Sequence, residues 1–254
     1  MHSPGRMFWE PFDYFERETY GMLKPLKFLS NIFLKIPLCY LRIADFNASK
    51  KVDKFIANSK VSQTRIKKYY GRESEIIYPF VDLDKFKDIK TEDGGFFLIL
   101  TRLVSWKKVD IAIDSCSQLN IKLKIIGDGP DLNRLKSKAS KNIEFLGYID
   151  DQEKIDLIRQ CKALIVTQKE DFGIVPLEAM ACGKPVIAYR SGGLLETVQE
   201  GITGEFFDEQ TIDSLSIVLK EFDSLKYTTQ DCKNRSLSFR KELFIDKIKQ
   251  ALLD

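Results

Sequence analysis

The chain has 254 residues, 44% of them hydrophobic, and its formal net charge is +3 at pH 7. A chain of this length buries enough apolar surface for one large domain or two small ones. Residues 1–82 hold 14 Lys and Arg against 9 Asp and Glu, whereas residues 83–254 hold 26 against 28. So weak a basic excess argues against nucleic acid as a partner, and no apolar run reaches the roughly 20 residues of a membrane span.

The cysteines and the histidine bear on metal binding and on the compartment. The five cysteines are scattered, no pair has the spacing of metal ligands, and the chain has one histidine. A zinc site would therefore lack ligands, so we expect no metal and no cofactor other than a substrate. Scattered cysteines in an odd number favour reduced, buried thiols in a cytoplasmic protein.

Residues 1–82 show little regular patterning. Strands are expected at residues 55–57 and 76–78, and the start of an interdomain linker at residues 79–82. Residues 19–44 contain four basic side chains, no acidic one and many Leu, Ile and Phe. Two interpretations of this stretch stay open: a pair of helices packed on the sheet of the first domain, or a basic amphipathic segment that lies on a membrane surface.

From residue 96 onward, apolar runs alternate with helical patterns. Strands are expected at residues 96–101, 123–127, 143–147, 163–167, 186–189 and 204–207. Helices are expected at residues 109–119, 130–139, 151–161 and 237–253, between Gly173 and Gly183, and from residues 194 and 211. This alternation predicts an α/β fold with a parallel sheet covered on both faces. Ligands bind beyond the carboxyl ends of such strands, where the predicted elements place Arg102, Gly127, Glu170 and Gly192.

The segment from residue 170 to residue 188 is the most informative part of the sequence. It places two carboxylates, Glu170 and Glu178, eight positions apart around a glycine turn and a helix start. At that start the backbone N–H groups of Phe172, Gly173 and Ile174 have no helical acceptor and form an anion site. Glu178 can accept hydrogen bonds from sugar hydroxyls. A phosphate cradle with carboxylates on both sides predicts a nucleotide-sugar site.

These residues resemble the donor-binding motif of retaining glycosyltransferases of the GT-B fold. They are most similar to the large group-4 family, which includes bacterial mannosyltransferases of polysaccharide assembly. The resemblance runs from His2 to about Leu253, and further stretches carry it in the same order: FIANS at 55–59, IYPFVD at 77–82, TRL at 101–103, GDGP at 127–130, FLG at 145–147 and GGLLET at 192–197.

The resemblance implies three parts. Residues 1–82 correspond to a partial N-terminal, acceptor-side domain of Rossmann type. Residues 83–236 correspond to a complete C-terminal, nucleotide-sugar-binding domain of the same type. Residues 237–254 correspond to a helix that crosses back to the first domain.

The resemblance also assigns roles to single residues. Arg102 and Lys107 are expected to stabilise the negative charge that grows on the leaving diphosphate, and Lys107 is favoured over its neighbour Lys108. Glu170 is expected to contact the transferred sugar, and Glu178 the ribose of the donor. Simple capping of a helix is the alternative role for both glutamates.

Three more residues receive roles in the same way. Gly127 is expected to line the pocket of the nucleotide base, and Gly192 to let the backbone approach the donor closely. His2 matches the histidine of the family's first domain that contacts the donor sugar. As the second residue of the chain, His2 is equally interpreted as part of a frayed terminus.

The implied reaction moves a sugar, with retention at the anomeric carbon, from a nucleotide-sugar to a saccharide or lipid-linked acceptor. GDP-mannose is the first expectation for the donor and a UDP-sugar the second. In this family the leaving phosphate is thought to assist attack on the same face, so the protein supplies positioning and electrostatics. A nicotinamide-dependent oxidoreductase is disfavoured because no complete glycine fingerprint with a later acidic residue is present.

The start of the chain departs from the family. Residues 2–9 resemble a motif midway through the first domain, so about a hundred residues, or one small domain, are expected to be missing. A sheet without its first strands leaves edges and an apolar face open, which predicts self-association, a partner subunit or contact with the inner face of the plasma membrane. The alternative function is thus a truncated or split donor-binding subunit that is inactive without a partner polypeptide.

Overall fold

The structure, a computed structural model, describes residues 4–10, 27–87 and 90–253. The chain divides into two compact units, Met1–Ile77 and Tyr78–Asp254. Within the described residues, the first unit has a two-stranded sheet and the second a six-stranded sheet. The second unit holds all the predicted site residues except His2.

The second unit is built on a sheet of short, apolar strands. These are β3 (Phe97–Leu100), β4 (Leu123–Ile126), β5 (Ile143–Gly147), β6 (Leu164–Val166), β7 (Val186–Tyr189) and β8 (Gly204–Phe207). They pair in the order β5-β4-β3-β6-β7-β8, and every pair is parallel. The chain therefore moves outward from β3 to β5, returns to the centre, and continues from β6 to β8. This is the doubly wound topology.

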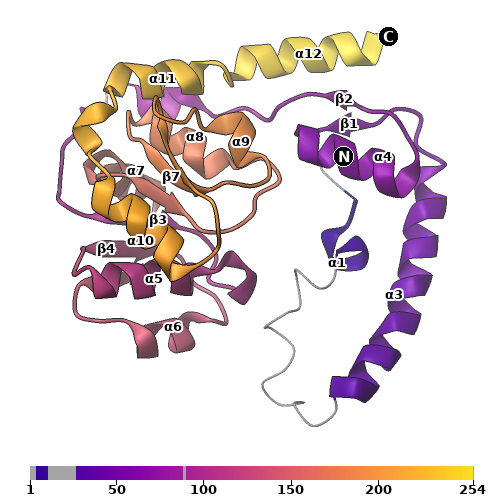
Figure 1. Cartoon of the computed structure of the whole chain (residues 1–254). Coiled ribbons are helices and arrows are strands. Elements are labelled where there is room, and N and C mark those ends of the chain that lie inside the picture. The colour runs from indigo at the N-terminus through magenta and orange to yellow at the C-terminus, as the bar shows by residue number, and fades with distance from the viewer. Residues whose placement is uncertain (1–3, 11–26, 88–89, 254) are drawn as a thin grey trace. The chain divides into compact units, whose positions relative to one another are not determined.

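Helices cover both faces of this sheet (Figure 1). One face carries α5 (Val109–Gln118), α6 (Leu132–Lys138) and α10 (Ile212–Glu221). The other carries α7 (Asp151–Gln160), α8 (Ile174–Ala181) and α11 (Thr229–Leu237). Strands buried on both faces are apolar at successive positions, as β3 and β6 are. The predicted α/β fold with a covered parallel sheet is confirmed.

Short elements complete the second unit. They are η2 (Leu83–Phe86), η3 (Ser105–Lys107), α9 (Leu194–Thr197), η4 (Ser224–Lys226) and the final helix α12 (Lys241–Leu253). The helix expected at residues 237–253 is thus shorter, and α11, which precedes it, was not predicted. The cause is a tertiary contact: the Val81 N–H donates to the Phe239 carbonyl at 3.0 Å, and Val81 and Arg240 form a parallel bridge. The turn at residues 238–239 and the bridge at Arg240 separate the two helices.

A second boundary differs for a similar reason. The helix predicted from Pro130 begins at Leu132. Before it, the Leu103 N–H donates to the Asp128 carbonyl at 2.9 Å, and the Asp131 N–H donates to the Leu103 carbonyl at 3.0 Å. The backbone of residues 128–131 is therefore used to hold the turn after β3, and the helix starts only after these bonds are made.

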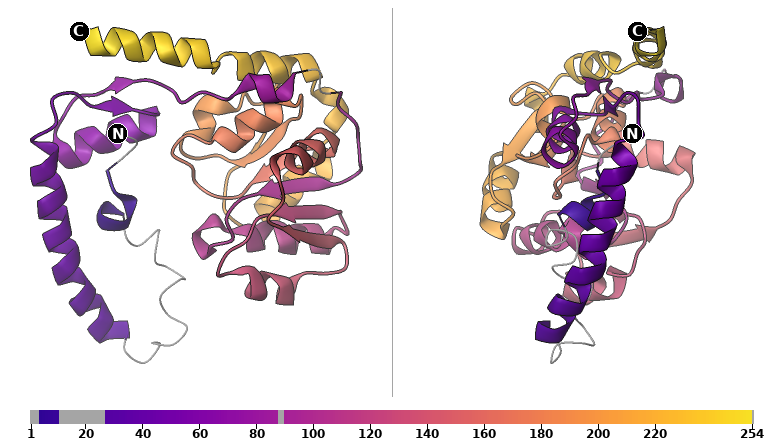
Figure 2. Two further views of the ribbon diagram at one scale, coloured as in Figure 1. Left: turned by 180° about the vertical axis from the view of Figure 1, so that it is seen from behind. Right: turned by 90° about the vertical axis from the view of Figure 1, so that its right-hand side faces the viewer.

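The first unit contains α1 (Arg6–Trp9), α3 (Lys27–Ser49), β1 (Ile56–Ala57), α4 (Lys60–Tyr70) and β2 (Glu75–Ile76) among its described residues. Its two strands pair in parallel. Helix α3 has 23 residues and contains Pro37, and its ribbon is uninterrupted in Figure 2. Residues 27–44 of the stretch considered from the sequence thus belong to one helix, because a proline removes one helical hydrogen bond without necessarily ending the helix. Residues 19–26 of that stretch lie outside the described residues.

Candidate functional site

The candidate site lies where the strand order reverses. β3 and β6 are neighbours in the sheet, but the chain leaves them in opposite directions, toward β5 and β8. In doubly wound sheets the crevice beyond the carboxyl ends of two such strands binds the ligand. Arg102 and Lys107 follow β3, and Glu170 follows β6. The fold thus brings three of the predicted residues to one edge of the sheet.

Lys107 and Glu170 form an ion pair at this edge. Lys107 Nζ donates to Glu170 Oε1 at 2.6 Å, and Gln168 Nε2 donates to the same oxygen at 2.7 Å. Only 12% of the lysine side chain and 24% of the glutamate side chain are exposed. The Thr167 hydroxyl also donates to the Lys107 carbonyl at 2.7 Å, so the loop after β3 is tied to the end of β6.

Lys108, the neighbour of Lys107, differs from it in backbone conformation. Its backbone adopts the left-handed conformation, with φ of 53°, and it is the residue that precedes α5. The Lys107 ammonium instead lies 4.4 Å from the centroid of the Trp106 ring and against Glu170. Lys107 thus pairs with a carboxylate of the motif, and its role in place of Lys108 stays a prediction.

Glycine permits a close contact between two loops of the site. Glu170 and Gly192 form a parallel bridge, and the Gly193 N–H donates to the Glu170 carbonyl at 2.8 Å. Gly192 has φ of +69°, and a Cβ atom placed on it would lie 2.1 Å from the Glu170 carbonyl oxygen. Any other residue would push the loops apart, so Gly192 has a structural reason to be glycine besides the predicted approach to a donor.

The N-terminus of α8 opens into the same region. Its cap residue, Gly173, has φ of 93° and supplies no side-chain hydrogen bond. Ile174 is the first helical residue and Pro176 lies in the first turn. The first N–H groups of a helix have no acceptor within it and carry partial positive charge. The predicted helix start is present at residues 173–174, while the Phe172 ring itself is buried in the core. Its use as an anion cradle stays a prediction.

Glu178 lies on α8, one helical turn beyond Ile174, and is 20% exposed. Its carboxylate is 3.7 Å from Lys154 Nζ of α7, and Lys154 also pairs with Asp151 at 3.2 Å. Burial raises the pKa of Glu178, and the Lys154 charge opposes this shift. Lys154 was not singled out from the sequence. Its only sequence signal is its place one turn after the acidic start of α7.

The other predicted residues are Arg102, Gly127 and His2, and in the described part of the chain no contact of Arg102 or Gly127 indicates its predicted role. The Arg102 side chain is exposed, and within the described residues no hydrogen bond or ion pair joins it to Lys107 or Glu170. Gly127 has φ of +131°, and a Cβ atom on it would lie 1.9 Å from the Thr101 carbonyl oxygen, so packing between the ends of β3 and β4 requires glycine there. His2 lies outside the described residues.

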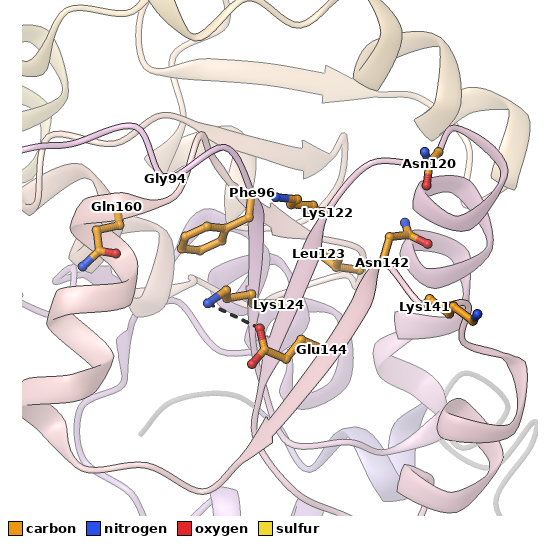
Figure 3. A pocket seen from close by; sticks show the side chains of 10 residues that line it. All are labelled: Gly94, Phe96, Asn120, Lys122, Leu123, Lys124, Lys141, Asn142, Glu144 and Gln160. Atoms are coloured by element: carbon orange, nitrogen blue, oxygen red, sulfur yellow. Dashed lines mark ion pairs between the residues drawn. The ribbon is translucent and has the colours of Figure 1, made fainter.

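A hollow of about 680 Å³ lies at the opposite edge of the sheet, at the amino ends of β3, β4 and β5. Lys122, Lys124 and Lys141 line it (Figure 3), and Lys124 pairs with Glu144 at 3.3 Å. None of the predicted site residues is among its lining residues. This hollow is therefore separate from the candidate site.

The described residues also bear on metals and on membranes. Across residues 4–10, 27–87 and 90–253, no three His, Cys, Asp or Glu side chains are grouped so that they could hold a metal ion. In the same part of the chain, no helix has both the length and the apolar character needed to cross a membrane.

Comparison with known proteins relates this geometry to a family. A family model described as glycosyl transferases group 1 matches residues 81–237. An uncharacterized glycosyltransferase of Methanocaldococcus jannaschii is 35% identical over 164 residues, which are 62% of this chain and 46% of its own. The alpha-1,3/1,6-mannosyltransferase ALG2 of Dictyostelium discoideum is 30% identical over 202 residues, with 60% of this chain and 48% of its own covered.

A solved structure shows the same fold. HepE of Anabaena, in complex with UDP and glucose, superposes with a TM-score of 0.73 at 24% identity, covering 84% of this chain and 66% of that chain. This likeness concerns the fold alone. The chain spans about half the length of the curated relatives it matches.

Proposed function

The chain belongs to the glycosyl transferases group 1 family, and from this premise we propose that it moves a sugar from a nucleotide-sugar to a saccharide or lipid-linked acceptor, with retention, in polysaccharide assembly. One observation carries the proposal. The Lys107–Glu170 ion pair lies beside an uncapped helix start at the point where the strand order reverses. A cation and free N–H groups there suit the negative diphosphate of a nucleotide-sugar, and a carboxylate can accept hydrogen bonds from its sugar hydroxyls.

In the proposed reaction, the bond between the anomeric carbon and the diphosphate oxygen breaks, and the acceptor oxygen takes its place on the same face. The proton of the acceptor hydroxyl passes to the departing phosphate. The Lys107 ammonium and the Arg102 guanidinium stabilise the charge that grows on this phosphate. Glu170 holds hydroxyls of the transferred sugar, and Glu178 those of the ribose. We assign no covalent nucleophile, so the protein contributes positioning and electrostatics.

Further assignments complete the proposed donor site. The N–H groups of residues 172–174 hold the phosphates, Gly127 borders the base, and Gly192 allows the donor to lie close to the backbone. His2 is assigned to the transferred sugar. No metal takes part in this proposal, since the helix N-terminus and the two cations supply the positive charge.

For the donor we propose GDP-mannose first and a UDP-sugar second. The mannosyltransferase name of one relative supports mannose, and the UDP bound to HepE supports the alternative. A thermal-shift series with GDP, UDP, GDP-mannose and UDP-glucose tests the site, because a ligand that binds only the native state raises its melting temperature. The proposal expects a shift with at least one of the four. No shift with any of them at millimolar concentration would contradict a nucleotide-sugar site.

We also propose that the protein works in the cytoplasm at the inner face of the plasma membrane, in contact through α3. The side chains of Ile36, Tyr40 and Ile43 recur at helical spacing and are all exposed, Ile36 by 70%. Lys50 and Lys51 follow the helix and are exposed as well. An apolar stripe next to basic side chains favours an anionic lipid surface. Sedimentation with phosphatidylglycerol vesicles, compared with phosphatidylcholine vesicles and with Ile36→Asp, tests this contact.

The alternative, a donor-binding subunit that needs a partner polypeptide, stays a prediction. Nucleotide binding and transfer separate the two functions. An active transferase releases nucleoside diphosphate from its donor when an acceptor is supplied, whereas a subunit binds the donor and releases none until a second chain is added.

A further inference from the structure

Tyr78 is the first residue of the second unit, and it directly precedes residues 79–82, where the sequence predicts the start of an interdomain linker. Its hydroxyl donates to Glu196 Oε2 at 2.9 Å. Its ring stacks on Phe172, with centroids 5.8 Å apart and planes inclined by 23°. One side chain thus contacts two segments that are far away in the sequence.

Those two segments are both parts of the candidate donor site. Phe172 lies between Glu170 and the start of α8. Glu196 lies in α9, which begins directly after Gly192 and Gly193. The segments also touch each other through the hydrogen bond from the Gly193 N–H to the Glu170 carbonyl. Tyr78 therefore spans the same pair of loops from the core side.

The surroundings of Tyr78 hold it firmly. Phe239 packs edge-on against both rings, with its centroid 5.6 Å from that of Tyr78 and 5.5 Å from that of Phe172. Arg235 of α11 lies over Phe239 at 5.0 Å and donates to the carbonyls of Glu196 and Thr197. Burial and the neighbouring carboxylate raise the pKa of Tyr78 to about 12. The hydroxyl thus stays protonated, and remains a donor, at neutral pH.

We propose that Tyr78 is a positioning residue of the donor site, holding residues 170–173 through its ring and residues 192–196 through its hydroxyl. The inference rests on the proposed function, since it concerns the same donor. It adds a residue that touches neither the donor nor the reacting atoms. The phosphate cradle, Glu170 and the Gly192 turn keep their relative positions because Tyr78 fixes both loops at once.

The structure offers a matched control. Tyr227 also donates its hydroxyl to a carboxylate, that of Glu205, and stacks on a phenylalanine, Phe222. Burial raises the pKa of Tyr227 as well. None of these three residues lies in the two donor-site segments. Tyr227→Phe therefore removes the same kind of bond as Tyr78→Phe and reports the purely structural cost.

The first measurement is amide hydrogen exchange on the free, full chain. Tyr78→Phe keeps the ring stack and removes the hydroxyl. The backbone amides of residues 170–174 and 192–197 should then exchange at least about fivefold faster, which is the factor expected for the loss of one hydrogen bond. Tyr227→Phe should leave these residues at the wild-type rate. Equal exchange in wild type and Tyr78→Phe would overturn the proposal, whether or not a nucleotide binds.

The second measurement is calorimetric titration with UDP and GDP. Tyr78→Phe should raise the dissociation constant of the nucleotide that binds by about fivefold, and Tyr227→Phe should not change it. Glu196→Ala should weaken binding at least as much as Tyr78→Phe, and the double variant should be no worse than Glu196→Ala, because the bond between Tyr78 and Glu196 is already lost there. Additive losses in the double variant would contradict the shared bond. Absence of binding to wild type would instead refute the proposed donor site.

Discussion

The two edges of the six-stranded sheet differ in how their charges are held. At the carboxyl edge, Lys107 and Glu178 are both shielded, and each faces an opposite charge. At the amino edge, Lys122 and Lys141 are exposed beside an open hollow. Shielding a charge costs free energy unless it is paired, so charges are rarely held in this way without a constraint. An exposed lysine needs no such explanation.

The comparison shows that a hollow alone does not locate a site. The carboxyl edge also has loops in backbone contact that only glycine allows, and it lies where the strand order reverses. Substitutions at the two edges should therefore differ sharply in effect.

The largest effect is expected for Gly192→Ala. The added Cβ would lie 2.1 Å from the Glu170 carbonyl oxygen, so the loops must separate and nucleotide binding should be lost. Gly201→Ala is the control, because Gly201 has a similar φ of +72° with nothing within 4 Å of the added Cβ. It should cost only the left-handed backbone, about 1–2 kcal/mol. Urea unfolding and calorimetry of both variants test this, and equal losses would contradict the close contact.

Lys107→Ala should come next. It removes the cation that we assign to the growing charge on the leaving group, so turnover should fall by about 10²–10³-fold, with a smaller change in nucleotide affinity. Lys108→Ala should change turnover little, since the proposed function assigns this side chain no contact with the leaving group. Initial rates of nucleoside diphosphate release decide between the two lysines. A greater loss for Lys108 would reverse the assignment.

Glu178→Ala should weaken nucleotide binding by roughly tenfold, because hydrogen bonds to a charged group contribute about 1.5–3 kcal/mol. Glu178→Gln should also weaken binding, but it is expected to stabilise the fold at neutral pH. Since burial raises the pKa of Glu178, the folded state holds the proton more tightly than the unfolded chain. Stability then falls as pH rises above the ordinary value of 4.5, up to the raised pKa.

Glu178→Gln cannot ionise, so the free energy of unfolding of the variant should fall less than that of wild type above pH 4.5. Unfolding by urea at several pH values measures this. Identical pH dependence in wild type and variant would mean that burial does not strain this carboxylate. A gain in stability with a loss of binding is the pattern expected of a residue kept for function.

The smallest effects are expected at the amino edge. Replacing Lys122, Lys124 and Lys141 by alanine one at a time should change the free energy of unfolding by no more than about 0.5 kcal/mol. Lys124 pairs with Glu144 near the surface, and such pairs contribute about 0–1 kcal/mol. Nucleotide affinity should not change. A marked loss of affinity in any of the three variants would move the site to this edge.

Much of the second unit was predictable from the sequence. The strands are apolar runs bounded by turn residues, and a covered parallel sheet is the fold that such a pattern favours. The motif at residues 170–188 indicated Glu170, Glu178 and the helix start between them, and the predicted GT-B glycosyltransferase resemblance is confirmed by the family match and the fold. The roles assigned to single residues stay predictions.

The remaining features depend on contacts between distant parts of the chain. Tyr78 and Glu196 are 118 positions apart, so no local pattern joins them. The break between α11 and α12 results from pairing with Val81. Helix α3 continues beyond Pro37 although proline disfavours a helix interior. Its later part is held by contacts with other elements, since Asp45 accepts hydrogen bonds from Trp9 and Tyr70. Lys154 meets Glu178 only because α7 and α8 cover the same face.

Calorimetric titration of a nucleoside diphosphate into three forms of the chain tests the carboxyl-edge site most directly. The forms are wild type, Glu178→Ala, and a triple variant with Lys122, Lys124 and Lys141 all changed to alanine. We predict that wild type and the triple variant bind GDP or UDP with equal affinity, and that Glu178→Ala binds it roughly tenfold more weakly. Unchanged binding by Glu178→Ala together with lost binding by the triple variant would contradict the placement of the site.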